Sequence, residues 1–261
     1  MKFMIAVDCE GAACVVGEPG MSLSNSCNMT FAKEQVTRET NAAVRALFDS
    51  GAKEVVVWDS HGDGVNLIYD QLDQRCEIVL GSGFERRFPQ LDESFTGVLM
   101  IGYHAMAGTA NAVLAHTYSS SAYYYIKVNG ENVGEIALDA AVAGELGVPL
   151  IFVASDDKGC AEAVEFVPWV EKVATKTGLG RNCARSKHPT LVENQIYAAV
   201  IRAVKHLDEK PPFAFKQPLQ LEVQYKSIGQ LIKARIRRRG WHATGARTLK
   251  GRLASMLDLK L

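Results

Sequence analysis

Two acidic residues at the end of the first apolar segment constrain the fold of this chain more than any other feature. Residues 3–7 are a short apolar run that leads directly into Asp8, Cys9, Glu10 and Gly11. Side chains of a strand alternate between its two faces, so Asp8 and Glu10 are expected on one face and Cys9 on the other. Two carboxylates on the same face repel each other unless a cation lies between them. The stretch therefore predicts a metal ion at the end of a buried strand.

Histidines follow two later segments that are also predicted to be strands. Residues 54–58 are a β-branched run followed by His61, and residues 97–101 are followed by His104. Ligands of α/β sheets bind outside the carboxyl ends of the strands, so these histidines are expected beside the acidic pair. Glu135, in the first turn of a predicted helix, could add a third carboxylate. Such a set suits zinc or another divalent metal, and a bridging carboxylate would make it a two-metal hydrolytic site.

Each of these residues also has a plainer interpretation. A glutamate such as Glu135 in the first turn of a helix stabilises the helix dipole, and a loop histidine commonly hydrogen-bonds to the backbone. The repetition at three strand ends favours a joint site over three coincidences. A catalytic thiol at Cys9 or Cys14 is a further alternative, and it is disfavoured because cysteine is commonly a small core residue.

The order of the predicted elements indicates an α/β fold with a mostly parallel central sheet and helices on both faces. Expected strands are 3–7, 54–58, 76–80, 97–101, 122–128, 150–154, 172–175 and 219–225, and expected helices are 30–50, 134–144, 158–166 and 190–207. Thr30 is expected to cap the first helix. Pro211 and Pro212 are expected to end the last helix and to separate a catalytic domain, residues 1–212, from a small basic α+β subdomain, residues 213–261.

The charge balance gives no overall reason to expect nucleic acid or a membrane as a partner, because 29 basic residues face 29 acidic ones. The balance hides a basic tail without acidic residues, which comprises Lys226, Lys233, Arg235, Arg237, Arg238, Arg239, Arg247, Lys250 and Arg252. Such a block could bind phosphates, so a nucleic-acid or assembly module is the alternative from a different functional class. A solvated face, or docking on an acidic surface of a neighbouring subunit, is the favoured interpretation.

The apolar segments are too short for export or membrane insertion. Residues 3–7 are stopped by Asp8 and Glu10, and no stretch approaches the ~18 apolar residues of a membrane span. The six cysteines include no C-x-x-C pair, which argues against a zinc knuckle or a dithiol redox motif. We therefore expect reduced thiols, a cytoplasmic location and no membrane partner.

Taken in order, the motifs resemble those of the D-aminopeptidase DppA family of zinc peptidases. They are Val7-Asp8-Cys9-Glu10-Gly11, Asp59-Ser60-His61, Gly102-Tyr103-His104-Ala105, His116, Val133-Gly134-Glu135 with Ala141-Val142-Ala143-Gly144, and Val153-Ala154-Ser155-Asp156-Asp157. The resemblance covers about residues 1–210 well and the tail weakly. Two positions depart from the family pattern: Ala6 replaces a common serine, and Trp58 replaces a smaller polar residue before Asp-Ser-His, where it could alter the pocket.

The resemblance implies a function and a set of site residues. In the family, matching positions bind two zinc ions, which implies five ligands here: Asp8, Glu10, His61, His104 and Glu135. Asp8 is the implied bridge between the metals, and His116 the implied catalytic nucleophile or base. The implied reaction removes N-terminal D-amino acids, such as D-alanine, from short peptides. The implied assembly is a ring-like homo-oligomer, with a decamer as one candidate size. A related two-metal amidohydrolase or aminopeptidase acting on L-peptides or another small amide is the alternative.

Overall fold

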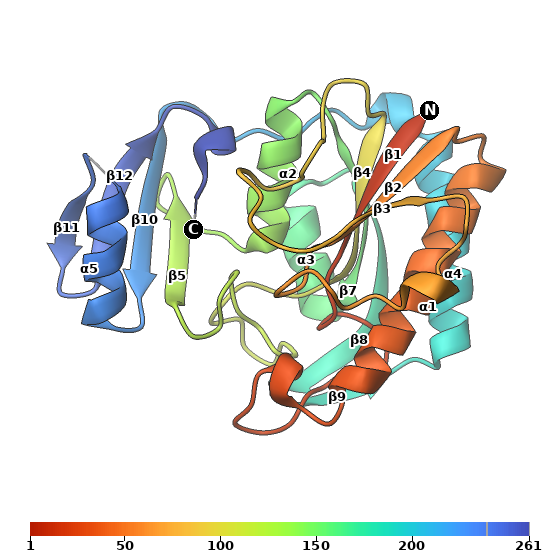
Figure 1. The fold of residues 1–261 in the computed structure, drawn as a ribbon, viewed down its shortest axis with the longest axis horizontal. Helices are drawn as coiled ribbons and strands as arrows, with labels where there is room; N and C mark the ends of the chain where they lie inside the picture. Colours follow the sequence, from red (N-terminus) through yellow and green to blue (C-terminus); the bar gives the residue numbers. More distant parts are fainter. Residues whose placement is uncertain (239, 261) are drawn as a thin grey trace.

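The chain folds into a large sheet with helices on both faces and a smaller antiparallel sheet at one end (Figure 1). The structure is a computed structural model that describes residues 1–238 and 240–260. The strands of the large sheet lie in the order β3 (Glu77–Val79), β2 (Glu54–Asp59), β1 (Lys2–Val7), β4 (Gly97–Tyr103), β7 (Leu150–Asp156), β8 (Glu171–Gly180) and β9 (Cys183–Ser186). Neighbouring strands are parallel except β8 and β9, which are antiparallel.

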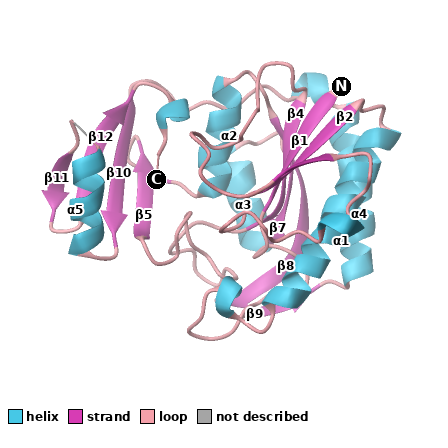
Figure 2. Cartoon of the chain, viewed as in Figure 1, coloured by secondary structure: helices cyan, strands magenta, loops and turns pink. Residues whose placement is uncertain are grey.

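Helices cover both faces of the large sheet. Helices α1 (Met29–Asp49) and α4 (Pro189–Lys205) lie on one face, and α2 (Glu135–Glu145) and α3 (Asp157–Phe166) lie on the other (Figure 2). Strand β1 is buried from both sides, because Ile5 packs in the core formed with α1 and α4 whereas Met4 packs in the core formed with α2. Burial on both faces explains why the central strands are continuous apolar runs. The predicted α/β fold, with a mostly parallel sheet between helices, is confirmed.

The small sheet joins two distant parts of the chain. Its antiparallel strands lie in the order β11 (His242–Gly245), β12 (Thr248–Leu253), β10 (Leu219–Tyr225), β5 (Tyr123–Val128) and β6 (Glu131–Asn132). Strands β5 and β6 come from within the range 1–212, so the tail 213–261 does not complete this sheet alone. The division at residue 212 stays a prediction. The structure adds that the small sheet takes strands from both sides of this boundary.

Several element boundaries differ from those expected. Helix α1 begins one residue before Thr30, and Asn28 is its first flanking residue. The Asn28 side chain accepts a hydrogen bond from the Val16 amide, so it ties down the preceding loop and does not cap the helix. Helix α4 ends at Lys205, before the Pro211-Pro212 pair, and a 3-10 turn (Leu207–Glu209) follows it. Strands β9, β11 and β12 were not expected from the sequence.

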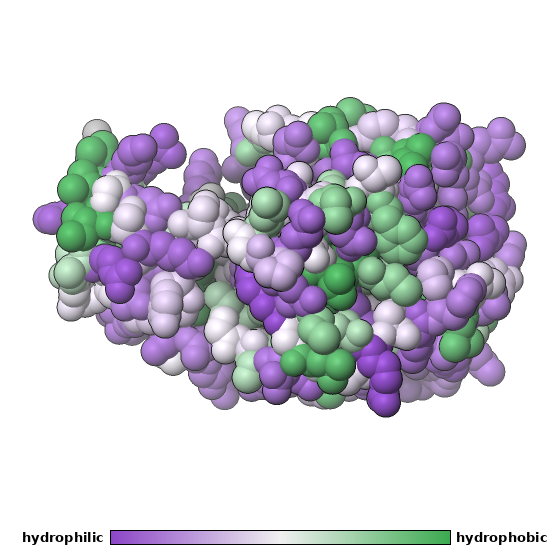
Figure 3. Space-filling model, turned by 90° about the horizontal axis from the view of Figure 1, so that it is seen from below, coloured by the Kyte–Doolittle hydropathy of each residue, from purple (hydrophilic) through white to green (hydrophobic). Residues whose placement is uncertain are grey.

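Helix α5 (Ile228–Arg237) covers the small sheet and carries much of the basic tail. One side of this helix presents Ile228, Ile232 and Ile236 to solvent with 57%, 53% and 77% of their surface exposed. Figure 3 shows hydrophobic atoms gathered at the end of the molecule where this helix and the small sheet lie. Arg239 of the basic tail lies outside the described residues. None of the described helices combines the length and the apolar character needed to cross a bilayer.

Candidate metal centre

The predicted site residues meet at the carboxyl edge of the large sheet. Asp8, His61 and His104 follow β1, β2 and β4, which are neighbours in the sheet. After β1 the chain continues to β2 on one side of it, whereas β4 lies on its other side and is followed in the sheet by β7. Open α/β sheets bind ligands at such a point. Glu135 is the first residue of α2, and His116 lies in the loop between β4 and β5.

A cavity of about 340 Å³ opens at this edge and is lined by Asp8, Glu10, His61, His116 and Glu135. Its volume lies near the lower end of the range of small-molecule sites, roughly 300–1,000 Å³. His104 lies beneath the cavity with 1% of its surface exposed. The six residues predicted to carry the chemistry are therefore all brought together in space.

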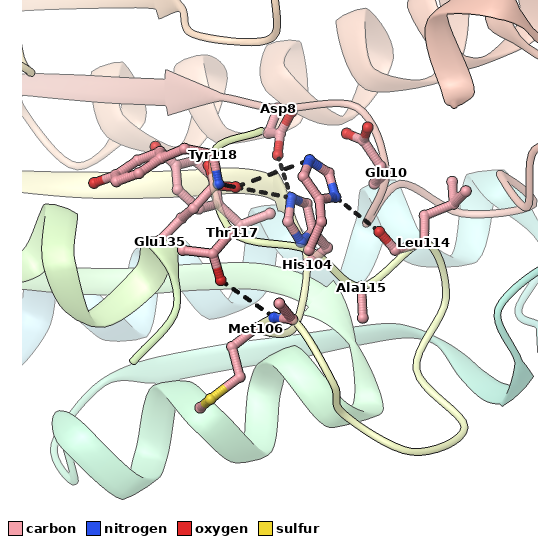
Figure 4. A network of polar contacts seen from close by, with 12 residues as sticks. Asp8, Glu10, His104, Met106, Leu114, Ala115, Thr117, Tyr118 and Glu135 are labelled. Atoms are coloured by element: carbon pink, nitrogen blue, oxygen red, sulfur yellow. Dashed lines mark hydrogen bonds and ion pairs between the residues drawn. The ribbon is translucent and has the colours of Figure 1, made fainter. Parts of the chain in front are cut away.

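Asp8 lies between two histidines, as Figure 4 shows for His104. Its Oδ1 is 2.7 Å from His61 Nδ1, and its Oδ2 is 3.3 Å from His104 Nε2. The two oxygens of one carboxylate thus face imidazoles that come from two different strands. Asp8 is therefore within reach of both histidines at once.

The hydrogen bonding of His104 leaves its Nε2 atom without a partner. Its Nδ1 lies 3.0 Å from the carbonyl oxygen of Ala105, which can only accept, so Nδ1 carries a proton. In the neutral ring Nε2 then holds a lone pair, and it faces Asp8 Oδ2 and Glu135 Oε1, each 3.3 Å away. Nε2 has no hydrogen-bond partner among the described residues. This nitrogen and two carboxylate oxygens therefore face one another, and either a proton on Nε2 or a metal ion between them would balance the carboxylates.

Glu10 supplies a second unmatched atom in the same place. Its Oε2 approaches His61 Nδ1 to 3.1 Å but is buried without a hydrogen bond of acceptable geometry. Ligand atoms of Asp8, Glu10 and His104 lie within 4.8 Å of one another, as do those of His104, His116 and Glu135. Nitrogen and oxygen donors without thiolates suit zinc and similar divalent metals, so the residues present fit such an ion.

The electrostatics of the cluster show what a metal would replace. Burial and then the charge of Glu10 raise the pKa of Asp8 to about 7. Burial alone would lower the pKa of His104, but Glu135 beside it raises this pKa to about 10. Burial alone would raise the pKa of Glu135, but His104 brings it down to about 2. Protons on the histidines balance the carboxylates here, and a divalent cation would take over that role.

His116 differs from the other histidines. Its ring stacks on His104 with 4.0 Å between centroids, and its Nδ1 donates to the Leu114 carbonyl oxygen at 2.8 Å. Its Nε2 is 4.0 Å from Glu135 Oε1, too far for a hydrogen bond. Burial and then the neighbouring His104 lower the pKa of His116. The ring is therefore held neutral, with the lone pair of Nε2 available at the cavity.

Lys176, which no sequence pattern indicated, holds the loop that carries Asp8 and Glu10. Lys176 lies on β8 with 1% of its surface exposed, and burial lowers its pKa to about 8. Its Nζ donates to the carbonyl oxygens of Glu10, Ala12 and Val15 at 2.6, 2.7 and 2.6 Å. The ammonium group thus holds three backbone carbonyl groups, at Glu10 and in the loop that follows it.

Asp59 plays a similar part for the His61 loop. It accepts hydrogen bonds from the amides of Asn66 and Leu67 and from the Tyr69 hydroxyl, at 2.6, 2.8 and 3.1 Å. The Asn66 side chain donates in turn to the His61 carbonyl oxygen at 2.6 Å. An aspartate that the sequence could equally assign to a simple turn therefore shapes the loop of a candidate ligand.

The cysteines near the site face away from it. Cys9 packs in the core with α1 and α4, on the opposite side from Asp8, and burial raises the pKa of its thiol far above the usual range. The Cys14 thiol contacts Ser186 and the Lys187 carbonyl oxygen and does not line the cavity. Neither thiol is placed to act as the nucleophile, as the position of Cys9 on the strand predicted.

The chain is similar to proteins of one known family over nearly its whole length. The family model for peptidase M55, described as D-aminopeptidase, matches residues 1–259. A D-aminopeptidase of Bacillus subtilis (strain 168) is 29% identical over 263 aligned positions, which cover 99% of this chain and 93% of the relative. A solved structure, the Zn-dependent D-aminopeptidase DppA from Bacillus subtilis, described as a self-compartmentalizing protease, superimposes with a TM-score of 0.91. It is 28% identical, and the match covers 99% of this chain and 93% of that one.

Proposed function

The chain belongs to the D-aminopeptidase family of metal-dependent peptidases, and we propose that it removes N-terminal D-amino acids, such as D-alanine, from short peptides with two zinc ions. The observation that carries the proposal is the Nε2 atom of His104, which is buried between two carboxylates without a hydrogen-bond partner. The Zn-dependent relative, which shares the fold over nearly the whole chain, supports the choice of zinc.

Five residues would hold the metals: Asp8, Glu10, His61, His104 and Glu135. Asp8 would be shared, because its two oxygens face different histidines. When bound, zinc supplies Lewis acidity, which lowers the pKa of water and polarises the amide carbonyl of a substrate. The carboxylates at the cavity can also accept hydrogen bonds from the free α-amino group of a peptide, which explains a requirement for an unblocked N-terminus.

His116 would accept a proton during the reaction. The Leu114 carbonyl oxygen fixes the proton on Nδ1, so Nε2 is the basic atom, and the lowered pKa keeps the ring neutral near pH 7. General bases contribute roughly 10²–10⁴-fold to rate. We therefore expect His116→Ala to lower kcat within that range while the zinc content measured by atomic absorption stays at the wild-type value. Full activity in this variant would remove His116 from the mechanism.

Paired assays on D-alanyl and L-alanyl anilides test the chirality of the substrate. Faster release from the D-anilide supports the proposal, whereas equal or reversed rates favour the alternative amidohydrolase or aminopeptidase acting on L-peptides or another small amide. Treatment with a chelator followed by zinc should abolish and then restore activity. Full activity of the metal-free protein would contradict the two-metal proposal.

We also propose that the chain assembles into a ring-like homo-oligomer, with a decamer as one candidate size. The description of the related structure as self-compartmentalizing supports assembly, and the exposed isoleucines of α5 offer an apolar surface for it. Sedimentation at micromolar concentration would show a large assembly, and a stable monomer would contradict it. The proposed location is the cytoplasm, which the six free cysteines support and which fractionation of cells would test.

The basic tail keeps the nucleic-acid alternative open. Among its described residues, Lys250 lies 3.8 Å from Glu222 on the neighbouring strand β10, which gives part of the charge a partner within the small sheet. A gel shift that weakens with salt would support nucleic-acid binding. No shift at low salt would remove that alternative.

A further inference from the structure

A second charged cluster lines the same cavity as the candidate metal ligands. Arg87, in the segment between β3 and β4, donates from Nε to Asp139 Oδ1 at 2.9 Å and from Nη2 to Asp139 Oδ2 at 2.6 Å. Asp139 on α2 is fully buried and also accepts from the hydroxyls of Tyr103 and Tyr118, each at 2.8 Å. Four donors therefore satisfy its two oxygens, and this carboxylate needs no further cation.

The Arg87 guanidinium is held between two aromatic rings. Its central carbon is 4.7 Å from the centroid of the Trp58 ring and 4.8 Å from that of Tyr118. Burial alone would lower the pKa of Arg87, but Asp139 holds it well above the usual range, so the charge is permanent. Trp58, at which the sequence departs from the family pattern, thus packs against the guanidinium and helps to hold it in place.

One nitrogen of this rigid group remains available. Because Nε and Nη2 are turned to Asp139, Nη1 is the donor left over, and it has no acceptor among the described residues. The Arg87 side chain keeps 24% of its surface exposed and lines the cavity together with Asp8 and Glu135. A fixed, flat guanidinium with a free N–H group is the arrangement that proteins use to bind carboxylates.

We propose that Arg87 binds the C-terminal carboxylate of the peptide substrate, so that the enzyme selects short peptides with a free carboxyl end. The inference rests on the proposed peptidase function. It follows from the arrangement of one small cavity. The metals that Asp8, Glu10 and Glu135 would hold are the place for the amino end of a peptide, and Arg87 offers its free Nη1 group to the carboxyl end in the same cavity. A peptide long enough to leave the cavity would lose the second contact.

Arg181 is the other cation of the cavity and the competing candidate. It donates from Nη1 to the Ala115 carbonyl oxygen and is exposed to solvent, which screens its charge. No aromatic stacking or ion pair of Arg181 is found among the described residues. Arg87 is therefore the better preorganised of the two.

The test compares each peptide with its C-terminal amide. We expect wild-type protein to hydrolyse D-alanyl-glycine with kcat/KM about 10–100-fold above that for D-alanyl-glycinamide, the range that corresponds to a hydrogen bond between charged groups. In Arg87→Gln the ratio should fall to near one. Arg87→Lys keeps a cation beside Asp139, which protects the fold, but loses the planar group, so its ratio should also fall.

Matched controls separate this role from a structural one. Arg86→Gln changes the neighbouring arginine, which donates to the Leu91 carbonyl oxygen and does not line this cavity, and it should keep the wild-type ratio. A wild-type ratio near one, a high ratio that survives in both Arg87 variants, or a ratio lost in Arg181→Gln instead would overturn the inference. Pairs of L-peptides are assayed in parallel. Cleavage of no peptide of either chirality would refute the peptidase function itself, whereas equal rates for acid and amide refute only the role of Arg87.

Discussion

Two buried charged clusters share one cavity and differ in how their atoms are satisfied. Around Asp139, four hydrogen bonds occupy both carboxylate oxygens, and the charge of Arg87 cancels that of the carboxylate. Around Asp8, Glu10 Oε2 and His104 Nε2 are buried without hydrogen-bond partners. The first cluster is complete within the protein, and the second needs either protons on its histidines or a metal ion to balance its carboxylates. Burial and charge alone do not indicate a metal site, whereas unmatched acceptors that face one another do.

The largest effect on activity is expected from a substitution of Asp8. Asp8→Ala removes the oxygens that face His61 and His104, so we expect loss of bound zinc and a fall in kcat/KM of at least ~10³-fold, since a catalytic metal supplies several kcal/mol. Metal analysis and a D-alanyl anilide assay measure both. A variant that kept its zinc and its activity would show that Asp8 is not a ligand.

A substitution in the Asp139 cluster should lower the stability of the fold and leave the zinc content unchanged. Asp139→Asn leaves the Arg87 charge without its counterion, and breaking a buried pair from one side costs about 3 kcal/mol or more of unfolding free energy. We expect this loss in urea unfolding, with the zinc content unchanged. Loss of zinc with normal stability would show that the two clusters are not separate.

That the candidate metal ligands lie together could be predicted from sequence, because these residues follow recognisable strands. Asp8, His61 and His104 each come directly after a β-branched or apolar run, and parallel strands end at a common edge. Glu135 opens a helix with a clear pattern. For these residues the distance along the chain is large, but the topology that brings them together is set by local signals.

The Arg87 cluster had no such signal. Arg87 lies in a segment without periodicity, and its partner Asp139 is 52 residues away on an alanine-rich helix. The place of β5 was hidden for the same reason, because its strand pattern does not show that it pairs with β10 in the small sheet. Lys176 looks like an ordinary strand residue until the loop after β1 folds over it. Pairings made in tertiary structure leave no periodic trace in the sequence.

A weaker effect is expected at Lys176, which supports the cluster around Asp8 indirectly. Lys176→Met leaves three carbonyl oxygens of the ligand loop without a donor, so the loop loses its fixed position. Changes behind a metal site typically cost 10–100-fold in affinity, and we expect zinc affinity, measured by competition with a chelator, to fall in that range. Unchanged affinity would show that Lys176 serves stability alone.

The smallest effect is expected at Cys9, which lies between two candidate ligands in the sequence but packs in the core on the opposite side. Cys9→Ala should retain zinc and activity and should lose about 1 kcal/mol of stability through the small cavity it creates. Loss of activity without unfolding would place the thiol in the site. This variant therefore tests whether a residue that lies between Asp8 and Glu10 in the sequence also takes part in the site.

Zinc stoichiometry tests the central claim most directly. Metal-free protein titrated with zinc in a calorimeter should bind about two equivalents per chain, one on each side of Asp8, and Asp8→Ala should lose this binding. Failure of the wild-type protein to bind zinc at micromolar concentration would contradict the account, because the unmatched atoms of Glu10 and His104 would then have no cation to satisfy them.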